Sequence, residues 1–203
     1  MIKIVDYGLG NILAFHNMCK RLNIATSVAK NTDDLQGATK IILPGVGAFD
    51  HAMQLLDASG MRGPLDELVL EREVPVLGVC VGMQILAKSS DEGQSCGLGW
   101  IDGHVKGFKS LNQPDLLLPH MGWNDVQPTA GSRLFAQLET DARFYFLHSF
   151  YFDCARQEDV AAVSNYGIDF SSAVSARNIH GVQFHPEKSH HFGAQLLKNF
   201  AEL

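Results

Sequence analysis

The clearest indication of the fold comes from Val76-Leu77-Gly78-Val79-Cys80-Val81-Gly82-Met83-Gln84. Its first four residues carry no polar side chain, which is typical of a short strand that is buried on both faces of a sheet. The pattern then predicts a helix from about Gly82 to Lys88, with no loop in between. A glycine–x–cysteine–x–glycine segment at such a junction indicates a nucleophile elbow in which cysteine replaces serine.

The spacing of the two glycines around Cys80 has a physical reason. A residue on a sharp turn between strand and helix is held in a strained backbone conformation, and side chains two positions away on either side would collide. Gly78 and Gly82 remove that collision because they have no Cβ. The amide groups at the start of the following helix favour a thiolate at Cys80, and the Val81 amide is placed to donate to an oxyanion. A buried cysteine that only packs remains the alternative.

The sequence before the elbow alternates short apolar segments with amphipathic ones. Asn11 predicts the N-cap of a helix that ends near Leu22, and Pro64 predicts the first turn of a helix that ends near Glu73. The intervening apolar segments predict strands at Ile2–Asp6, Ala25–Ala29 and Ile41–Leu43. Strands that alternate with helices in this way indicate β-α-β units and a mostly parallel sheet.

The second half of the chain is richer in strands separated by turns. The segments that we expect to be extended are 101–105, 123–126, 144–148, 160–163, 170–176 and 179–184. A last helix presents Phe192, Leu196, Phe200 and Leu203 on one side. We therefore expect an α/β fold in which a mostly parallel central sheet is flanked by helices and extended by antiparallel strands. The length of 203 residues favours one domain spanning residues 1–203.

Composition and charge exclude several classes of protein. Sixteen basic and 22 acidic residues give a net charge of −6, and no basic run is present, so we expect no nucleic-acid partner. The uncharged stretch from Val74 to Ala87 is too short to cross a bilayer, so we expect no membrane partner. Four cysteines without a C-x-x-C pair indicate neither a disulfide scaffold nor a zinc site. Without an export signal near Met1, we expect a cytoplasmic protein.

A thiolate nucleophile requires a histidine to move protons and an acceptor to orient that histidine. His185-Pro186-Glu187 offers both at the end of an apolar strand, with His185 and Glu187 on the same side of an extended segment. Pro186 stiffens the segment and keeps His185 extended. His190 and His191 follow closely, but no cysteine or acid completes a metal-ligand pattern. We therefore expect no metal and no cofactor.

Two glycine-rich turns follow other predicted strands. The Pro44–Phe49 segment would let backbone amides approach a ligand, so it predicts a second oxyanion donor, although a plain turn would also fit. The Gly8-Leu9-Gly10 turn resembles a dinucleotide fingerprint, but Leu13 occupies the place of its third glycine. We expect no dinucleotide there.

Together these motifs resemble those of the class I, triad-type glutamine amidotransferases. Gly78–Gln84 resembles their nucleophile motif and His185-Pro186-Glu187 resembles the rest of their Cys-His-Glu triad. The resemblance spans the whole chain and is closest to one branch of the family, whose members supply ammonia for histidine biosynthesis. The further segments that carry it are 6–11, 44–49, 97–99, 119–124, 148–151 and 183–189. The fold implied by the resemblance is flavodoxin-like.

The resemblance also implies a role for each matching residue. Cys80 attacks the side-chain amide of glutamine, His185 transfers protons and Glu187 orients His185. The implied backbone oxyanion donors are Val46, Gly47 and Val81, and the implied glutamine-binding residues are Gly47, Gly82, Gln84, Ser149 and Phe150. The products are glutamate and ammonia.

Ammonia must travel through a dry passage because in water it is mostly ammonium, which is not nucleophilic. The resemblance implies a partner, a cyclase subunit of (β/α)8 type that forms a heterodimer with this chain. Asn11, Trp123 and Asn124 are the expected interface residues, although Trp123 would also suit a core position. Three alternatives remain open: an amidotransferase subunit acting on a surface-polysaccharide sugar, a free-standing γ-glutamyl hydrolase or cysteine peptidase, and a non-catalytic binding module.

Overall fold

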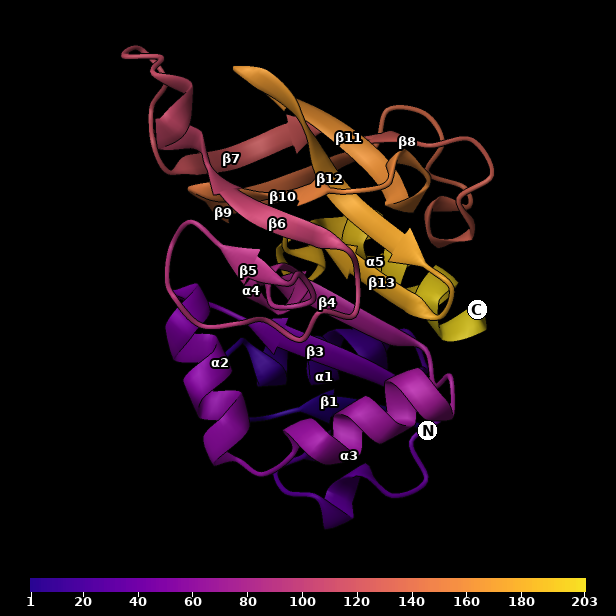
Figure 1. Ribbon diagram of the computed structural model, residues 1–203. Helices are drawn as coiled ribbons and strands as arrows, with labels where there is room; N and C mark the ends of the chain where they lie inside the picture. The colour runs from indigo at the N-terminus through magenta and orange to yellow at the C-terminus, as the bar shows by residue number, and fades with distance from the viewer.

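The protein, described here by a computed structural model of residues 1–203, is built around one sheet of eleven strands (Figure 1). Along the sheet the strand order is β2-β1-β3-β4-β13-β12-β10-β6-β5, and β11 pairs with β12 and with β8. The neighbouring strands on the first side are all parallel: β1 (Ile2–Val5), β2 (Thr26–Ala29), β3 (Lys40–Gly45), β4 (Val76–Cys80) and β13 (Ile179–Val182). The predicted parallel half of the sheet is thus confirmed.

Antiparallel strands extend the sheet beyond β13. The longer ones are β12 (Ile168–Ala176), β11 (Val160–Tyr166), β10 (Phe150–Cys154) and β6 (Gly103–Gly107), and a short one is β8 (Gln127–Pro128). The last strand of the sheet is the short β5 (Ser89–Ser90). β5 pairs with β6 in parallel. A separate two-stranded antiparallel ribbon consists of β7 (His120–Asp125) and β9 (Arg143–His148). The predicted antiparallel additions are therefore confirmed.

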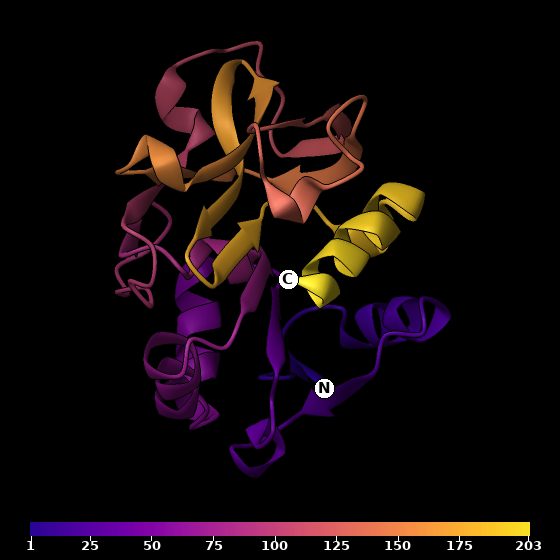
Figure 2. The same ribbon diagram turned by 90° about the vertical axis from the view of Figure 1, so that its right-hand side faces the viewer.

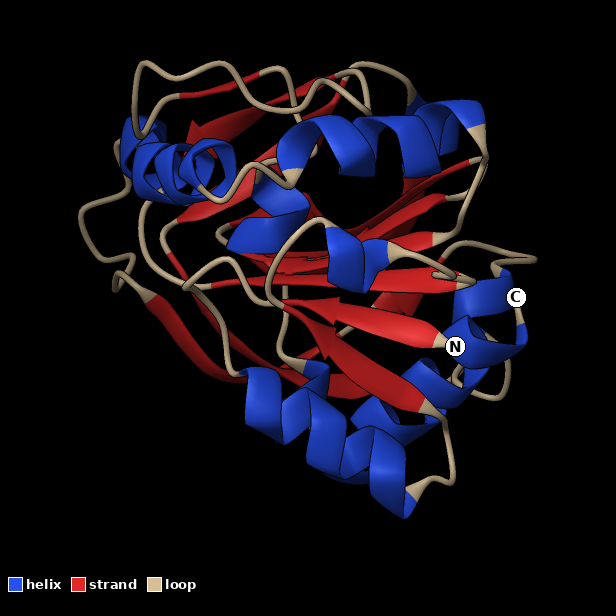
Figure 3. Ribbon diagram, turned by 90° about the horizontal axis from the view of Figure 1, so that it is seen from below, coloured by secondary structure: helices blue, strands red, loops and turns tan.

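Helices cover both faces of the parallel half. α1 (Ile12–Arg21) and α5 (His190–Glu202) lie on one face, and α2 (Phe49–Ala58) and α3 (Arg62–Asp66) lie on the other (Figure 2). A π-helical turn, Glu67–Glu71, continues α3. Seen from below, the strands lie between these two layers of helices (Figure 3). No helix has the length and the apolar character that crossing a bilayer requires.

The first helix forms as its sequence predicts. The side chain of Asn11 accepts a hydrogen bond from the Ala14 amide at 3.4 Å, which satisfies a free donor of the first turn. Phe15, Met18 and Cys19 face the sheet and are buried. They belong to a hydrophobic core of 52 residues that joins the parallel and antiparallel parts of the fold.

Three local predictions differ from the structure. α2 was not predicted, although Phe49, Ala52, Met53 and Leu56 show a helical spacing and all are buried. The strand β10 was not predicted either. The helix after the elbow, α4 (Val81–Gln84), is four residues long and does not reach Lys88.

The early end of α4 has a structural reason. Leu98 donates its backbone N–H to the Ile85 carbonyl, and Lys88 donates its own to the Gly103 carbonyl. The chain after Gln84 forms one further turn, in which Leu86 donates to Met83 and Ala87 to Gln84, and then pairs with the loop before β6 and with the first residue of β6. This pairing turns the backbone away from the helix axis and leaves the elbow at an edge of the sheet.

The strand register brings three segments to that edge. Gly45 at the end of β3 lies opposite Cys80 at the end of β4, and Val182 at the end of β13 lies opposite Val79. Because the carboxyl ends of parallel strands share one edge, the segment after Val182 emerges beside Cys80. The fold thus places the loop after β3, the elbow and the His-Pro-Glu segment together.

Candidate active site

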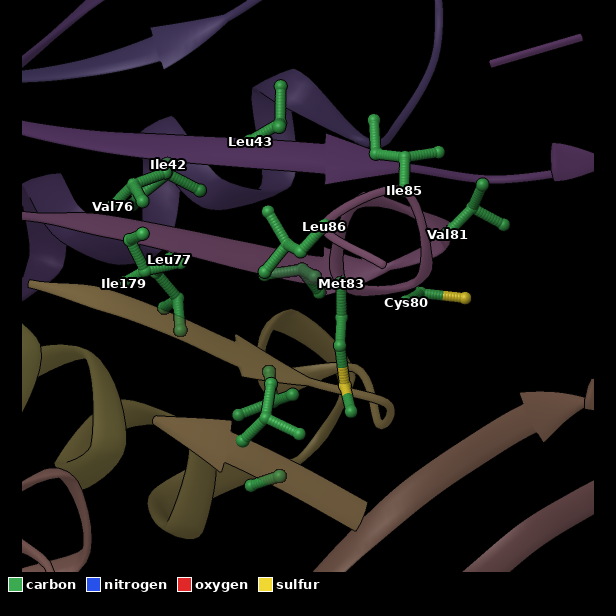
Figure 4. Packing of buried hydrophobic residues seen from close by; sticks show 14 of the residues in the cluster. Ile42, Leu43, Val76, Leu77, Cys80, Val81, Met83, Ile85, Leu86 and Ile179 are labelled. Atoms are coloured by element: carbon green, nitrogen blue, oxygen red, sulfur yellow. The ribbon is translucent and has the colours of Figure 1, made fainter. Parts of the chain in front are cut away.

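Cys80 occupies the predicted elbow. Its backbone has φ 56° and ψ −115°, a conformation that residues with a side chain seldom adopt. A Cβ on Gly78 would lie 2.5 Å from the Gly82 carbonyl oxygen, and a Cβ on Gly82 would lie 1.9 Å from the Leu43 carbonyl oxygen. Both glycines are therefore required by close approach of the backbone. Figure 4 shows the Cys80 side chain pointing away from the packed interior at the end of β4.

His185 and Glu187 form a buried pair. His185 Nδ1 lies 2.9 Å from Glu187 Oε1, and the two side chains are 4 % and 2 % exposed. The backbone of His185 is held on both sides, since its N–H donates to the Tyr145 carbonyl and its carbonyl accepts from the Ser189 hydroxyl. The imidazole also lies beside Cys80, which lines the same cavity and contributes to the pKa shift of His185. Sulfur, imidazole and carboxylate therefore meet in one place.

The surroundings of His185 favour its protonated form. Burial alone lowers the pKa of His185, but the hydrogen bonds to Cys80 and Glu187, together with the negative charges of both, raise it to about 10. An imidazolium at neutral pH is able to give a proton to a departing group.

A cavity of about 300 Å³ opens at Cys80. Of the residues expected from sequence to take part, eight line it: Val46, Gly47, Cys80, Val81, Gln84, Ser149, Phe150 and His185. Gly82 does not line the cavity but packs against the backbone of β3, and its expected role in binding glutamine stays a prediction. Glu187 lies behind His185.

The structure adds cavity residues that were not predicted. Glu92, from the loop after β5, lines the cavity and accepts the Phe49 N–H at 2.8 Å. Pro119, Leu147, His148 and Lys188 also line it. A single acid in a loop gives no recognisable pattern, so nothing in the sequence distinguishes Glu92.

A second unpredicted residue, Gln183, approaches the sulfur from the side of β13. It is fully buried, its Nε2 lies 3.9 Å from Cys80 Sγ, and its Oε1 accepts from Gln84 Nε2 at 3.0 Å. The sequence did contain an indication of this role, because Gln183 is a polar residue at the end of an apolar strand, directly before Phe184 and His185. A polar side chain that is buried there needs a hydrogen-bond partner.

The expected interface residues are scattered over the surface. Asn11 is exposed and caps α1. Trp123 is 40 % exposed, which excludes a core position, and its ring stacks on that of His190 at 5.5 Å. Asn124 is half-buried and its amide donates inward to the Asn165 carbonyl.

Two further histidines, His120 and His148, are buried beside the cavity and hydrogen-bond to each other at 2.8 Å. Burial lowers the pKa of His120 to about 4. The pKa of His148 falls to about 3, mainly because of burial and despite its hydrogen bond to the Phe150 carbonyl. Burial also lowers the pKa of His180 to about 4. All three are therefore neutral in the folded protein near pH 7.

These histidines predict that acid weakens the fold. In the unfolded chain each becomes protonated below about pH 6.5, while in the folded protein each stays neutral, so their stabilising contribution is lost as the pH falls from 6.5 toward 4. Well below pH 6.5 each adds a slope of up to about 1.4 kcal/mol per pH unit to the free energy of unfolding. Urea unfolding at pH 7, 6 and 5 measures how the free energy of unfolding changes with pH. A His148→Leu variant should show a shallower slope, and an unchanged slope would contradict the prediction.

Comparison with known proteins agrees with this geometry. The family model described as glutamine amidotransferase class-I matches residues 3–203. The chain is 62 % identical to imidazole glycerol phosphate synthase subunit HisH of Bdellovibrio bacteriovorus and 52 % identical to the HisH subunit of Leptospira borgpetersenii, over the full length of both chains in each case.

Solved structures agree on the fold. A crystal structure of a glutamine amidotransferase superimposes with a TM-score of 0.77 at 19 % identity, over 99 % of this chain and 97 % of the other. The structure of PurLQS from Thermotoga maritima gives a TM-score of 0.70 at 16 % identity with the same coverage. Because the family model covers almost every residue, including the elbow and the His-Pro-Glu segment, the chain belongs to the class-I glutamine amidotransferases.

Proposed function

We propose that this protein is the glutaminase subunit of imidazole glycerol phosphate synthase, which hydrolyses glutamine to glutamate and supplies the ammonia to a cyclase subunit in histidine biosynthesis. The observation that carries the proposal is the placement of Cys80 and His185 on one cavity, with Glu187 hydrogen-bonded to His185 behind it. The full-length similarity to the HisH subunits of Bdellovibrio bacteriovorus and Leptospira borgpetersenii supports the choice of this particular synthase.

In the first half of the reaction Cys80 sulfur attacks the side-chain carbonyl carbon of glutamine. A carbon–sulfur bond forms, the carbon–nitrogen bond breaks, and the His185 imidazolium gives its proton to the leaving nitrogen, so that ammonia departs. The backbone amides of Val46, Gly47 and Val81 stabilise the negative oxygen of the intermediate. The position of these three residues around the cavity supports this role.

In the second half water hydrolyses the γ-glutamyl thioester. Neutral His185 takes a proton from the water, the carbon–sulfur bond breaks, and glutamate leaves while Cys80 and His185 return to their starting forms. Glu187 keeps the imidazole oriented and stabilises its positive charge through both halves.

Glutamine also needs groups that hold its amino-acid end. Gln84, Ser149 and Phe150 line the cavity and supply polar side-chain and backbone atoms. We assign the α-ammonium group of glutamine to Glu92, because its carboxylate lines the same cavity. Gly82 lets the elbow pack against β3.

The partner is a cyclase subunit of (β/α)8 type that forms a heterodimer with this chain. Large apolar side chains are exposed beside the cavity: Met121 at 65 % and Trp123 at 40 % on β7, Leu147 at 37 % on β9, and Val46 at 40 % after β3. Such a group favours a protein–protein contact. A subunit that covers the cavity mouth would let ammonia pass without meeting water. We place the protein in the cytoplasm, where this pathway's substrates are made.

The test of this proposal is the dependence of glutaminase activity on the partner. The purified chain alone should release glutamate slowly, and adding the cyclase subunit with its phosphoribulosyl substrate should raise the rate at least about tenfold, because binding energy of the partner completes the site. Glutamate release in a coupled assay measures it. An unchanged rate on adding both would contradict the proposal.

The same assay decides between the alternatives. A free-standing γ-glutamyl hydrolase would work at full rate alone, and a polysaccharide amidotransferase would respond to its amidation-ready sugar and sugar-specific partner. Neither alternative is favoured by the relatives, whose names all specify the HisH subunit.

A further inference from the structure

A chain of buried hydrogen bonds connects strand β7 with the cavity. Asn124 Nδ2 lies 3.2 Å from His120 Nε2, and His120 Nδ1 lies 2.8 Å from His148 Nε2. His148 Nδ1 lies 2.7 Å from the Phe150 carbonyl oxygen. His120 and His148 are 4 % and 6 % exposed, so water does not compete for these contacts.

The direction of every hydrogen bond in this chain follows from its last member. The Phe150 carbonyl only accepts, so His148 Nδ1 carries the hydrogen and, in a neutral ring, its Nε2 accepts. His120 Nδ1 must then donate, which leaves His120 Nε2 as an acceptor for the Asn124 amide. Both rings are therefore in the Nδ1–H tautomer.

The orientation of the Asn124 amide agrees with this direction. Its Nδ2 also donates to the Asn165 carbonyl at 2.9 Å, and its Oδ1 accepts the Asp125 N–H at 2.8 Å. A flipped amide would lose both contacts. The Asn124 amide at one end of the hydrogen-bond chain and the Phe150 carbonyl at the other thus require the same tautomer, Nδ1–H, of His120 and His148.

The chain continues from Phe150 to the nucleophile. The Phe150 carbonyl also accepts from Gln84 Nε2 at 3.3 Å, Gln84 Nε2 donates to Gln183 Oε1, and Gln183 Nε2 lies 3.9 Å from Cys80 Sγ. His148, Phe150, Gln84 and Cys80 all line the cavity. The Phe150 carbonyl therefore joins the two histidines to the groups that surround the sulfur.

We propose that His148, held by His120, is a positioning residue for the glutaminase reaction: its Nδ1–H fixes the Phe150 carbonyl and through it Gln84, Gln183 and the Cys80 sulfur. The proposal rests on the glutaminase function and specifies two residues that act in it without touching glutamine's reacting amide. Loss of the His148 donor leaves the Phe150 carbonyl to Gln84 alone, so the glutamine end of the cavity and the sulfur lose a common support. A misplacement of this kind far from the chemistry costs up to about 100-fold in rate.

The test compares two replacements of His148 that differ in one donor. Asparagine places an N–H close to the position of Nδ1 and keeps the bond to Phe150, whereas leucine has a similar size and no donor. His148 is surrounded by Phe108, Phe146 and Phe170, so leucine suits the site better as packing. We expect kcat for glutamine hydrolysis to fall at least about tenfold in His148→Leu and less than about threefold in His148→Asn. In thermal unfolding the order should be reversed: His148→Leu should have a higher Tm than His148→Asn, because leucine packs better in the apolar site.

The same comparison at His120, with His120→Asn and His120→Leu, should show the same order with smaller effects, because His120 acts on Phe150 only through His148. Full activity of His148→Leu, or equal loss in the leucine and asparagine variants, would overturn the proposal and leave His148 as a packing residue. Rescue by asparagine supports it, since a purely structural role predicts the reverse order.

A spectroscopic measurement separates this proposal from the function on which it rests. Nitrogen-15 NMR of the histidine rings in the cyclase complex should show the Nδ1–H tautomer for both His120 and His148 at pH 7. An Nε2–H tautomer at either His120 or His148 would overturn the proposed hydrogen-bond chain, whether or not the enzyme is active. Absence of glutamine hydrolysis in the wild-type complex would refute the proposed function instead.

Discussion

Replacing Cys80 with alanine should reduce glutamine hydrolysis by at least about 10⁴-fold, the largest effect on activity that we expect from any single substitution. The substitution removes the sulfur that attacks the amide, and no other cysteine lines the cavity. Glutamate release by the cyclase complex measures the loss.

The fold of the Cys80→Ala variant should survive, since alanine keeps the Cβ and adds no new strain at this positive φ. Cys96→Ala is the matched control, because Cys96 is an exposed free cysteine on the loop before β6 and should leave the rate unchanged. The Cys80→Ala variant is intact if its Tm and its binding to the cyclase subunit equal those of the wild type. Glutamine hydrolysis that persists in Cys80→Ala would remove Cys80 from the mechanism.

The Gly82→Ala variant should lose at least about 3 kcal/mol of stability, which for a chain of this size lowers Tm by roughly 10 °C. Its Cβ would lie 1.9 Å from the Leu43 carbonyl oxygen, so either β3 or the elbow must move. Both are backbone, and neither has a flexible end that could swing aside. Thermal unfolding and urea unfolding measure the effect, and glutaminase activity should fall with it because Cys80 is displaced.

Gly63→Ala is the control for the Gly82 substitution. Gly63 lies at the start of α3, a Cβ added to it would meet no atom within 4 Å, and its φ is not positive. Alanine there should therefore be neutral or stabilise by up to about 1 kcal/mol. If Gly82→Ala and Gly63→Ala are equally stable, the close approach of the backbone at the elbow does not require glycine at position 82.

Local patterns in the sequence were sufficient for much of the parallel half. The continuous apolar run at 76–79, followed at once by a cysteine between glycines, predicted the buried strand and the elbow, because burial and steric collision leave few other choices. Asn11 predicted the start of α1 for the same local reason. The missed helix α2 also had a local signal, in the spacing of Phe49, Met53 and Leu56, that the preceding Pro-Gly turn obscured.

Other features had no local signal. The length of α4 depends on backbone bonds with Leu98, in a later loop, and with Gly103, at the start of β6. Glu92 enters the cavity because its carboxylate caps the start of α2 at Phe49, a contact across two separate loops. The close approach of Gly82 to the backbone of β3 likewise depends on the register of β4 against β3.

Local patterns in the sequence predicted the reacting groups: a cysteine on an elbow, and a histidine and a glutamate two residues apart on a stiff segment. Their meeting depends on long-range pairing, because the last strand, β13, inserts beside β4 with Val182 opposite Val79. The same register brought Gln183 to the sulfur, and the pairing of β7 with β9 placed His120 opposite His148. The physical reason is that strand pairing joins residues distant in the chain through hydrogen bonds that look alike for every sequence, so the partner is selected by the packing of the whole core.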